Sequence, residues 1–447
     1  MTKEITSKEL TDFQKSLDAT PGSAAIKNAV ANNGIYKSSE TLASKIAMDP
    51  TFSVEIDTGS VSDQKQSGLC WAFAALNTMR HPIQNNFKIK GFELSEAYML
   101  FWDKLEKSNY FYENVINTAA LPIGDRKVDF LMATPQQDGG QWDMVMALVA
   151  KYGVVPKAVM PDTASRTNSR ELNSVLNTKL RKNAVTLRKL VNDGESENDI
   201  QRQKDEMLSE IYKILVYSVG EPPEKFDWAY RDDDKKYHKE VGITPQDFFK
   251  KYVGWDLDNY ISTINAPTDD KPYNHVYTVE LLGNVVGGRQ VRHLNLELKD
   301  FKKLAVEQLQ SGETVWFGSD VVKSSDRKLG IMDTKIYDLN SLFNTDFSMT
   351  KAERLDYVES MMDHAMVITG VELDENGDPT KWKVENSWGE KVGQKGYFVM
   401  SDDWFNEYVY QLVINKNLLS DQLKTTFDKE TKDPKVLAPW DPMGDLA

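Results

Sequence analysis

The chain contains a single cysteine, Cys70, among its 447 residues. One thiol can form neither an internal disulfide nor a cysteine-rich metal site, so neither can hold this fold together. A hydrophobic content of 40% in a chain of this length is enough for a sizeable, ordered core. What remains for Cys70 is the role of a small buried hydrophobic residue or that of a nucleophile.

The residues around Cys70 favour the nucleophile. Gly68 marks a loop, and the apolar stretch 71–79 predicts a buried helix that we expect to stop at Pro82. Cys70 would then lie at the helix N-terminus, where the helix dipole favours a thiolate. A lone cysteine beside an apolar helix is more often inert core. Gln64 changes the odds, because its side-chain amide and the Cys70 N–H would make a two-donor oxyanion hole.

A thiol nucleophile needs a base, and four of the five histidines are weak candidates. His81 lies about 16 Å from Cys70 along the expected helix, too far for proton transfer, and is expected to interact with the helix C-terminal dipole. His238 lies in a charged run and is expected to be solvated. His275 and His293 lie in polar, strand-like stretches without an obvious acceptor nearby.

His364 is the better candidate, because it begins an apolar run, 364–371, that predicts a buried strand. After a turn, a second strand over 382–389 would place Asn386 beside His364. Asn386 would accept a hydrogen bond from one imidazole nitrogen and leave the other facing the thiol, while Trp388 would shield the pair from water. The alternative is a buried hairpin in which His364 and Asn386 only satisfy each other.

Together, Gln64, the block 67–73, the block 363–365 and the block 386–389 resemble the signatures of papain-like cysteine peptidases, in the same chain order. The resemblance implies a role for each residue: Cys70 as nucleophile, His364 as general base and acid, Asn386 as its orienter, and Gln64 as oxyanion donor.

The block Asp138, Gly139 and Gly140 resembles the family's glycine-rich substrate strand, whose backbone pairs with the peptide. An ordinary turn is the alternative. Ser67 and Gln137 stand where secreted members of the family carry a disulfide, so both partners of that bond are absent. Their absence is what a reducing compartment requires.

Cys70 and His364 are 294 positions apart (364 − 70), against about 130–150 in ordinary papain-like enzymes, so the core carries a large insertion. This longer layout and the ending 439–447 resemble the bleomycin hydrolase and bacterial aminopeptidase C family, over essentially the whole chain.

The resemblance implies an α+β, papain-like core of two lobes, a helical left lobe and a right lobe built on an antiparallel sheet. The expected units are an N-terminal helical arm (1–50), the left lobe with the nucleophile helix (51–165), a helical insertion used in oligomerisation (166–262), the right lobe with His and Asn (263–420), and a C-terminal arm reaching the active-site cleft (421–447). The first arm begins with a helix that has a capping box at Thr6 and Glu9 and ends near residues 21–22, and the stretch from there to about residue 50 is expected to wrap the core. The insertion shows two amphipathic stripes, one in 172–180 and one in 207–215.

In this family the C-terminal arm lies in the cleft and its terminal carboxylate meets the α-ammonium group of the substrate. By resemblance Ala447 supplies that carboxylate, so peptides are trimmed from the N-terminus. A frayed tail is the plain alternative. Asp445 adds a second negative charge, and our hypothesis is that it favours peptides with a basic first residue.

A net charge of −14 argues against broad nucleic-acid binding and against anionic membrane surfaces. The chain shows no apolar signal segment and no run long enough to span a bilayer, so we expect a cytoplasmic protein. No histidine–carboxylate cluster suggests a metal, and no cofactor is expected. The expected partners are peptides with a free N-terminus and, by resemblance, further copies of the chain in a homohexamer.

The expected reaction begins from an imidazolium–thiolate pair, which attacks the carbonyl of the first peptide bond and forms a thioester that water hydrolyses. The main alternative is a cysteine endopeptidase of the same family with its C-terminal arm displaced from the cleft. A nucleic-acid-binding role and a scaffold with an unused site are two weaker hypotheses.

Overall fold

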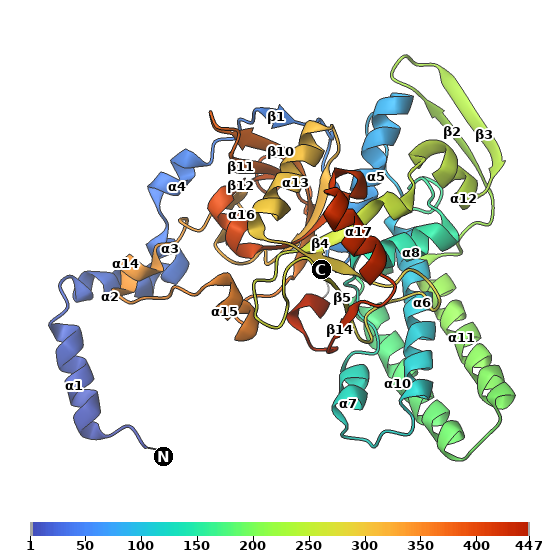
Figure 1. Ribbon diagram of the computed structural model, residues 1–447, viewed down its shortest axis with the longest axis horizontal. Helices are drawn as coiled ribbons and strands as arrows, with labels where there is room; N and C mark the ends of the chain where they lie inside the picture. The colour runs from blue at the N-terminus through green and yellow to red at the C-terminus, as the bar shows by residue number, and fades with distance from the viewer. Residues whose placement is uncertain (1–2, 446–447) are drawn as a thin grey trace.

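The structure is a computed structural model that describes residues 3–445. It is an α+β fold in which a helical lobe lies beside a lobe built on one large sheet (Figure 1). The N-terminal helices extend away from both lobes, and the C-terminal segment returns to the middle of the molecule.

The helical lobe is built around α5 (Cys70–Phe87), most of whose side chains are buried. The sequence predicted that this helix stops at Pro82, but it continues for a further turn. Proline in a helix interior removes one hydrogen bond, a loss that the fully buried Met79 and Ile83 on either side offset by packing in the core. The other helices of the lobe are α6 (Glu96–Asn117), α7 (Arg126–Ala133), α8 (Trp142–Tyr152) and α9 (Ala164–Thr167).

The insertion adds two long helices, α10 (Arg170–Asn192) and α11 (Glu197–Val219), which pack along α6. Both predicted amphipathic stripes are confirmed as their buried faces, except that Val175 is 54% exposed. We expected the chain after α11 to be helical, but it forms an antiparallel ribbon. Alternating apolar residues begin the first strand of this ribbon, and the charged run 231–236 forms the turn between its two strands. The elements are β2 (Phe226–Arg231), β3 (Tyr237–Ile243), α12 (Pro245–Phe248), a π-helical turn (Phe249–Val253) and a 3-10 turn (Leu257–Asn259).

In the described residues the second lobe holds twelve strands in one sheet, in the order β14-β5-β6-β4-β13-β7-β10-β11-β12-β9-β8, with β1 added beside β10. Most neighbours are antiparallel, as predicted, and three pairs are parallel. The strands are β1 (Val54–Glu55), β4 (Tyr260–Ile264), β5 (Val276–Val279), β6 (His293–Asn295), β7 (Val315–Ser319), β8 (Ser325–Asp326), β9 (Ile331–Met332), β10 (His364–Leu373), β11 (Pro379–Glu385), β12 (Tyr397–Ser401), β13 (Val409–Asn415) and β14 (Lys435–Leu437).

Helices and turns connect and cover these strands, with α13 packed against β13 and β10. They are α13 (Leu298–Gln310), α14 (Leu339–Phe343), α15 (Lys351–Asp356), α16 (Asp402–Tyr408), α17 (Asp421–Glu430) and the 3-10 turns Lys416–Leu418 and Pro442–Gly444.

The sheet draws strands from four of the five units expected from the sequence. β1 comes from the stretch assigned to the left lobe, yet Val54 pairs with Val371 of β10. β4 straddles the expected border of the insertion at residue 262, and β14 of the C-terminal arm pairs with β5. Strand pairing joins distant segments, so local patterns do not reveal which strands share a sheet.

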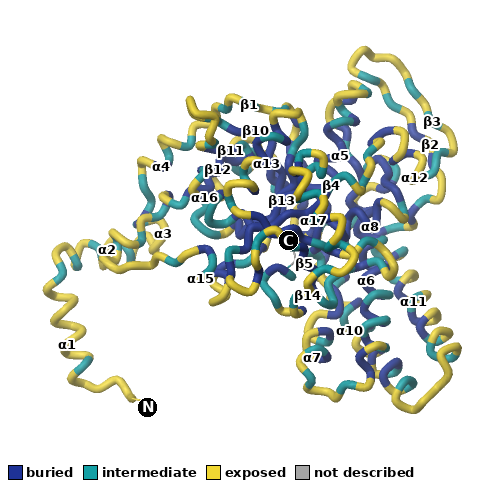
Figure 2. The backbone as a smooth tube through the Cα atoms, viewed as in Figure 1, coloured by how far each residue is buried: buried dark blue, intermediate teal, exposed yellow. Residues whose placement is uncertain are grey.

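The N-terminal arm consists of α1 (Ser7–Asp18), α2 (Ser23–Asn33), α3 (Ile35–Ser39) and α4 (Leu42–Ala47). The predicted capping box of Thr6 and Glu9 is confirmed. The expectation that the stretch after α1 wraps the core holds only in part, because α2 projects from the body (Figures 1 and 2) and buries no residue. Contact begins at α3, where the rings of Tyr36 and Tyr337 lie 5.0 Å apart, and continues where the Thr41 hydroxyl donates to the Lys335 carbonyl.

The two lobes meet at α5 and β10. Trp71 of α5 accepts a hydrogen bond at its carbonyl from the Trp316 indole N–H of β7, at 3.1 Å. Ala365 and Val367 of β10 belong to the same hydrophobic cluster as the first two turns of α5. The start of the central helix therefore faces the start of the strand that carries His364.

Candidate active site

Cys70 is the first residue of α5 and is buried, with 3% of its surface exposed. The Leu69 carbonyl before it accepts hydrogen bonds from the N–H groups of Ala72 and Phe73, at 3.0 and 2.9 Å. The thiol therefore sits at the N-terminus of a long helix, as the sequence predicted.

His364 and Asn386 come together at the joined ends of β10 and β11, where Val367 pairs with Glu385. The His364 Nε2 atom lies 2.9 Å from Asn386 Oδ1, so an Nε2–H donates to the amide oxygen and leaves Nδ1 free to exchange a proton. Trp388 stacks on the His364 ring, with centroids 4.8 Å apart. This arrangement matches the predicted orienter and shield.

Burial disfavours the charged form of both the Cys70 thiol and the His364 imidazole. It raises the pKa of the Cys70 thiol to about 12, although the backbone of Ala365 and Trp71 lowers it in part. Burial also lowers the pKa of His364 to about 4, against the opposing effect of the Asn386 hydrogen bond. The burial of both groups therefore opposes the expected imidazolium–thiolate pair, whereas the position of Cys70 at a helix N-terminus favours the thiolate.

Gln64 is held in place by Ser387, a residue that we did not single out from the sequence. The Gln64 N–H donates to the Ser387 carbonyl at 2.8 Å, and the Ser387 hydroxyl donates to Gln64 Oε1 at 2.5 Å. One N–H of the Gln64 amide donates to the Ser67 carbonyl at 2.8 Å, which leaves the other for a substrate oxygen. The only sequence signal for Ser387 was its place directly after Asn386.

The Asp138 side chain is fully engaged inside the protein. Its carboxylate accepts from Lys104 at 2.8 Å, from Asn173 at 2.8 Å, from the Gly68 N–H at 3.1 Å, and from the Ser169 hydroxyl. Although burial acts to raise it, Lys104 and the other donors hold the pKa of this carboxyl well below its usual range. Asp138 therefore fastens the glycine segment 138–140 to the nucleophile loop rather than offering a charge to a substrate.

The two glycines beside Asp138 lie against the start of α5. A Cβ atom on Gly140 would lie 2.5 Å from the Trp71 ring, so only glycine fits there. The Trp71 indole N–H donates to the Asp138 carbonyl at 2.6 Å, and Lys107 donates to the Gly139 carbonyl at 2.7 Å. This glycine segment, 138–140, has no regular secondary structure and is fixed against the start of α5.

The C-terminal arm is anchored along its length up to residue 445. β14 pairs with β5, Asp441 forms an ion pair with Lys271 at 3.0 Å, and Arg126 lies 3.6 Å from the Trp440 ring centroid. The Gln141 amide donates to the Asp445 carbonyl at 2.6 Å. Because Gln141 follows Gly140, the arm reaches the glycine segment.

Ala447 lies outside the described residues. Asp445 lies in the wall of a cavity of about 350 Å³ between the arm and the helical lobe, and neither Cys70 nor His364 lines that cavity. Burial and the neighbouring Asp441 raise the pKa of Asp445 to about 6. Our hypothesis that Asp445 attracts a basic first residue stays a prediction.

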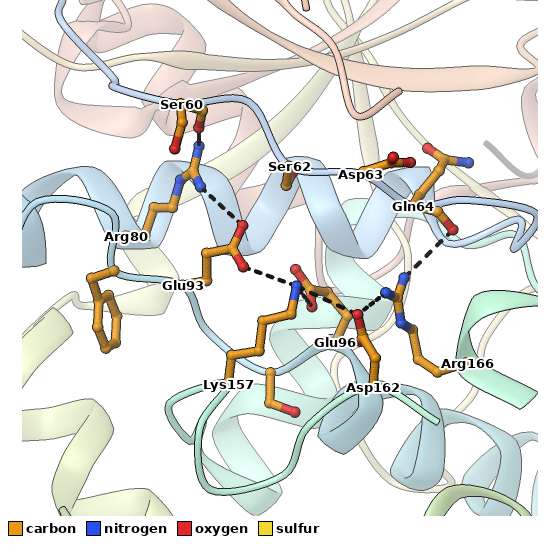
Figure 3. Close-up of polar contacts among 12 residues, drawn as sticks. Ser60, Ser62, Asp63, Gln64, Arg80, Glu93, Glu96, Lys157, Asp162 and Arg166 are labelled. Atoms are coloured by element: carbon orange, nitrogen blue, oxygen red, sulfur yellow. Dashed lines mark hydrogen bonds and ion pairs between the residues drawn. The ribbon is translucent and has the colours of Figure 1, made fainter. Parts of the chain in front are cut away.

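Figure 3 shows a row of charged residues beneath the Gln64 loop. The fully buried Arg166 donates to the Gln64 carbonyl at 3.5 Å and pairs with Asp162. Lys157 continues the row, with its Nζ atom 3.7 Å from Asp162 and 2.9 Å from Glu93.

The row ends at a buried ion pair beside Asn386. Arg80 of α5 lies 3.8 Å from Glu93, and its Nη2 atom lies 2.8 Å from Glu385. His81 lies 3.3 Å from the other Glu385 oxygen. Its partner is therefore this carboxylate, whereas we had expected the C-terminal end of the helix dipole. Glu385 directly precedes Asn386, so the ionic row connects the oxyanion candidate with the His364 orienter.

Each of the other three histidines lies close to a polar partner. His238 lies 2.8 Å from Asp232, and His293 lies 2.7 Å from the Ser262 hydroxyl. His275 lies 3.0 Å from Glu430, an acceptor that the sequence did not reveal because it comes from α17.

Asp363 is a second residue that we did not single out as functional. Burial and the repulsion of Asp320 raise the pKa of its carboxyl to about 7, although the Val321 N–H donates to it at 2.8 Å. Its negative charge in turn raises the pKa of Cys70. The charge of the Asp363 carboxyl, which titrates near neutral pH, thus changes the pKa of the Cys70 thiol.

The variant Asp363→Asn is expected to make Cys70 react faster with iodoacetamide above pH 7, by about threefold at pH 9. Above its pKa, Asp363 carries a charge that disfavours the thiolate, and asparagine removes that charge while still accepting from Val321. At about pH 5 the carboxyl is neutral and the two rates should agree. Alkylation rates across this range, followed by intact mass, check the prediction, and an equal difference at both ends would contradict it.

Among residues 3–445 no group of three or more His, Cys, Asp or Glu side chains is placed to hold a metal ion. Within the same described range, no helix combines the length and the apolar character that a membrane crossing requires.

Comparisons with known proteins identify relatives of the chain. A profile of the Peptidase C1-like family matches residues 4–444. The chain is 60% identical to an aminopeptidase C from Lactobacillus delbrueckii subsp. lactis, over 100% of this chain and 99% of that protein. It is 49% identical to an aminopeptidase C from Listeria monocytogenes, over the full length of both.

A crystal structure of PepW from Lactobacillus rhamnosis HN001 superimposes on the chain with a TM-score of 0.99, at 65% identity and with full coverage of both chains. The chain therefore belongs to the Peptidase C1-like family and, within it, to the bleomycin hydrolase and aminopeptidase C group of cysteine peptidases.

Proposed function

We propose that this cysteine aminopeptidase removes N-terminal residues from peptides through Cys70, His364 and Asn386. The observation that carries the proposal is the 2.9 Å contact of His364 Nε2 with Asn386 Oδ1, at the start of the strand that packs against the Cys70 helix. Such a contact fixes the imidazole tautomer and turns Nδ1 toward a proton donor.

The reaction begins with transfer of the Cys70 thiol proton to His364 Nδ1 as the sulfur attacks the carbonyl carbon of the first peptide bond. The Cys70 N–H and the free N–H of Gln64 stabilise the oxyanion. His364 then gives the proton to the leaving amine, and the C–N bond breaks to leave a thioester on Cys70. Water, deprotonated by His364, attacks the thioester and releases the amino acid and the thiol.

The transfer of the proton during attack, rather than before it, follows from the burial of both groups. The raised pKa of Cys70 and the lowered pKa of His364 disfavour a charged pair before the substrate arrives. When a peptide is bound, the N–H groups of Cys70 and Gln64 donate hydrogen bonds to its carbonyl oxygen. They stabilise the negative charge that develops on that oxygen during the attack.

We propose further that the C-terminal arm makes the enzyme an exopeptidase. Support comes from the Gln141–Asp445 contact, which holds the arm next to the glycine segment two residues before its end. The carboxylate of Ala447 would then pair with the α-ammonium group of the substrate and block longer peptides on that side. By family resemblance we also propose a cytoplasmic homohexamer in which the α10–α11 insertion contributes contacts.

The test compares one peptide with a free N-terminus and with an acetylated N-terminus. The intact chain is expected to hydrolyse the acetylated peptide roughly a hundredfold more slowly, because the acetyl group removes the charge that the carboxylate binds. Deletion of Ala447 should reduce this preference and permit cleavage at internal bonds. Equal cleavage of both peptides at internal bonds by the intact chain would support the endopeptidase alternative instead.

A further inference from the structure

Arg327 lies over the indole that shields the catalytic histidine. It belongs to the turn between β8 and β9, and its guanidinium carbon lies 4.3 Å from the Trp388 ring centroid. Trp388 in turn stacks on His364 at 4.8 Å. The Arg327 charge is close enough to contribute to the lowered pKa of His364. Only the Trp388 ring separates the Arg327 guanidinium from His364.

The Arg327 guanidinium has no carboxylate partner within residues 3–445. The side chain is exposed, and within residues 3–445 it forms no hydrogen bond or ion pair with a carboxylate. Its neighbour Asp326 accepts instead from the backbone N–H groups of Lys328 and Leu329, both at 2.9 Å. An arginine held over an indole, with all its N–H groups free, presents a rigid fork that suits a carboxylate.

The surroundings are basic although the whole chain carries a net charge of −14. The turn also carries Lys328, and the loop 389–396, which packs against this turn at Gly330, carries Lys391 and Lys395. Within the described residues none of these three lysines forms an ion pair. Glu390 is the acidic residue of that loop, so the local charge remains positive.

The position of Arg327 relative to a substrate follows from the proposed function, on which this inference rests. The glycine segment and the C-terminal arm occupy the side of Cys70 that receives the N-terminal residue. His364 protonates the leaving amine, so the leaving peptide lies on the side of His364 and Trp388. Arg327 borders that side.

We propose that Arg327 binds a carboxylate on the first residue of the leaving peptide. In a dipeptide this group is the terminal α-carboxylate, and in a longer peptide it is an aspartate or glutamate side chain. Both present the same pair of oxygens to the guanidinium fork. Arg327 is thereby a specificity-determining residue that favours dipeptides and peptides with an acidic second residue.

The experiment measures kcat/KM for four substrates: Leu-Leu, Leu-Leu-amide, Leu-Glu-amide and Leu-Gln-amide. The variant Arg327→Gln is expected to lower kcat/KM about fivefold for substrates with a carboxylate on the second residue, the upper range for a partly exposed ion pair. The two uncharged amides should change little. Arg327→Lys should restore part of the loss, and added salt should weaken the preference of the parent enzyme.

The matched control is Lys328→Gln, which removes a charge from the same turn and leaves the Trp388 contact intact. It is expected to change every rate by less than about twofold. A response of Leu-Leu alone would identify the α-carboxylate as the ligand, and a response of Leu-Glu-amide alone the acidic side chain. Equal loss on all four substrates, or no loss on any, would overturn the proposal.

Hydrolysis of Leu-Leu-amide by the parent enzyme keeps the two hypotheses apart. If this uncharged substrate is hydrolysed and the Cys70→Ala variant does not hydrolyse it, the proposed function stands whatever Arg327 does. If Cys70→Ala remains active on all four substrates, the proposed function fails independently of the Arg327 result.

Discussion

Cys70→Ala is expected to lower kcat/KM by at least about ten-thousandfold on peptides with a free N-terminus, because removal of a nucleophile leaves only binding and oxyanion stabilisation. The fold should survive, since alanine is only slightly smaller than this buried residue and α5 continues through the position. Peptidase assays with purified variant, together with thermal unfolding to verify the fold, check the prediction.

The single cysteine makes an independent measurement possible. An alkylating reagent can add to only one thiol per chain, so intact mass should show one adduct and activity should fall in proportion to it. The matched control is Gln64→Ala, which keeps the nucleophile and removes one oxyanion donor. It is expected to lose about a hundred- to a thousandfold in kcat. Full activity of Cys70→Ala would show that the reaction does not use Cys70 and that this site is unused.

The residues that the sequence predicted for the site are those that lie in short local patterns. Cys70 was recognisable from the helix that follows it, and His364 and Asn386 from two strands joined by a turn. The pairing of these strands requires only a hairpin, a local structure that alternating and apolar runs indicate well. The structure accordingly places His364 and Asn386 in contact.

The residues that supported the site were harder to predict because their partners are distant in the chain. Ser387 meets Gln64 across 323 positions, and Arg80 meets Glu385 across 305. No local pattern specifies such pairs. The effect of burial on the Cys70 thiol was also beyond prediction, since the depth of burial is a property of the folded chain.

The N-terminal arm shows the same limit. The capping box of Thr6 and Glu9 marked the start of α1 correctly. A capping box does not say what covers a helix, and Phe13 of α1 is 59% exposed. For the same reason the sequence did not reveal that α2 buries no residue, so the expected wrapping of the core holds only in part.

Glu385→Ala is expected to lower the free energy of unfolding by about 3–5 kcal/mol, the cost of leaving a buried cation without its partner. The Glu385 side chain is fully buried, and Arg80 beside it is 2% exposed. Burial acts to raise the pKa of Glu385, but Arg80 and His81 more than offset it, so the pKa lies below its usual value and the carboxylate is charged. Chemical denaturation at neutral pH measures the change.

Two further variants separate the ion pair from simple loss of packing. Glu93→Gln removes the other, partly exposed carboxylate near Arg80, 3.8 Å away, and is expected to cost less than about 1 kcal/mol. The double variant Arg80→Met with Glu385→Leu should be more stable than Glu385→Ala, because it removes both buried charges and keeps their volume. Equal stability of Glu385→Ala and Glu93→Gln would contradict the prediction.

The same variants distinguish stability from positioning in catalysis. Glu385 directly precedes Asn386, and β11 ends between them. If the ion pair holds Asn386 at 2.9 Å from His364, the double variant should fold well and still show a lower kcat. Glu93→Gln, which leaves the Arg80–Glu385 pair in place, should keep its kcat. A double variant with full kcat would restrict Glu385 to a role in stability.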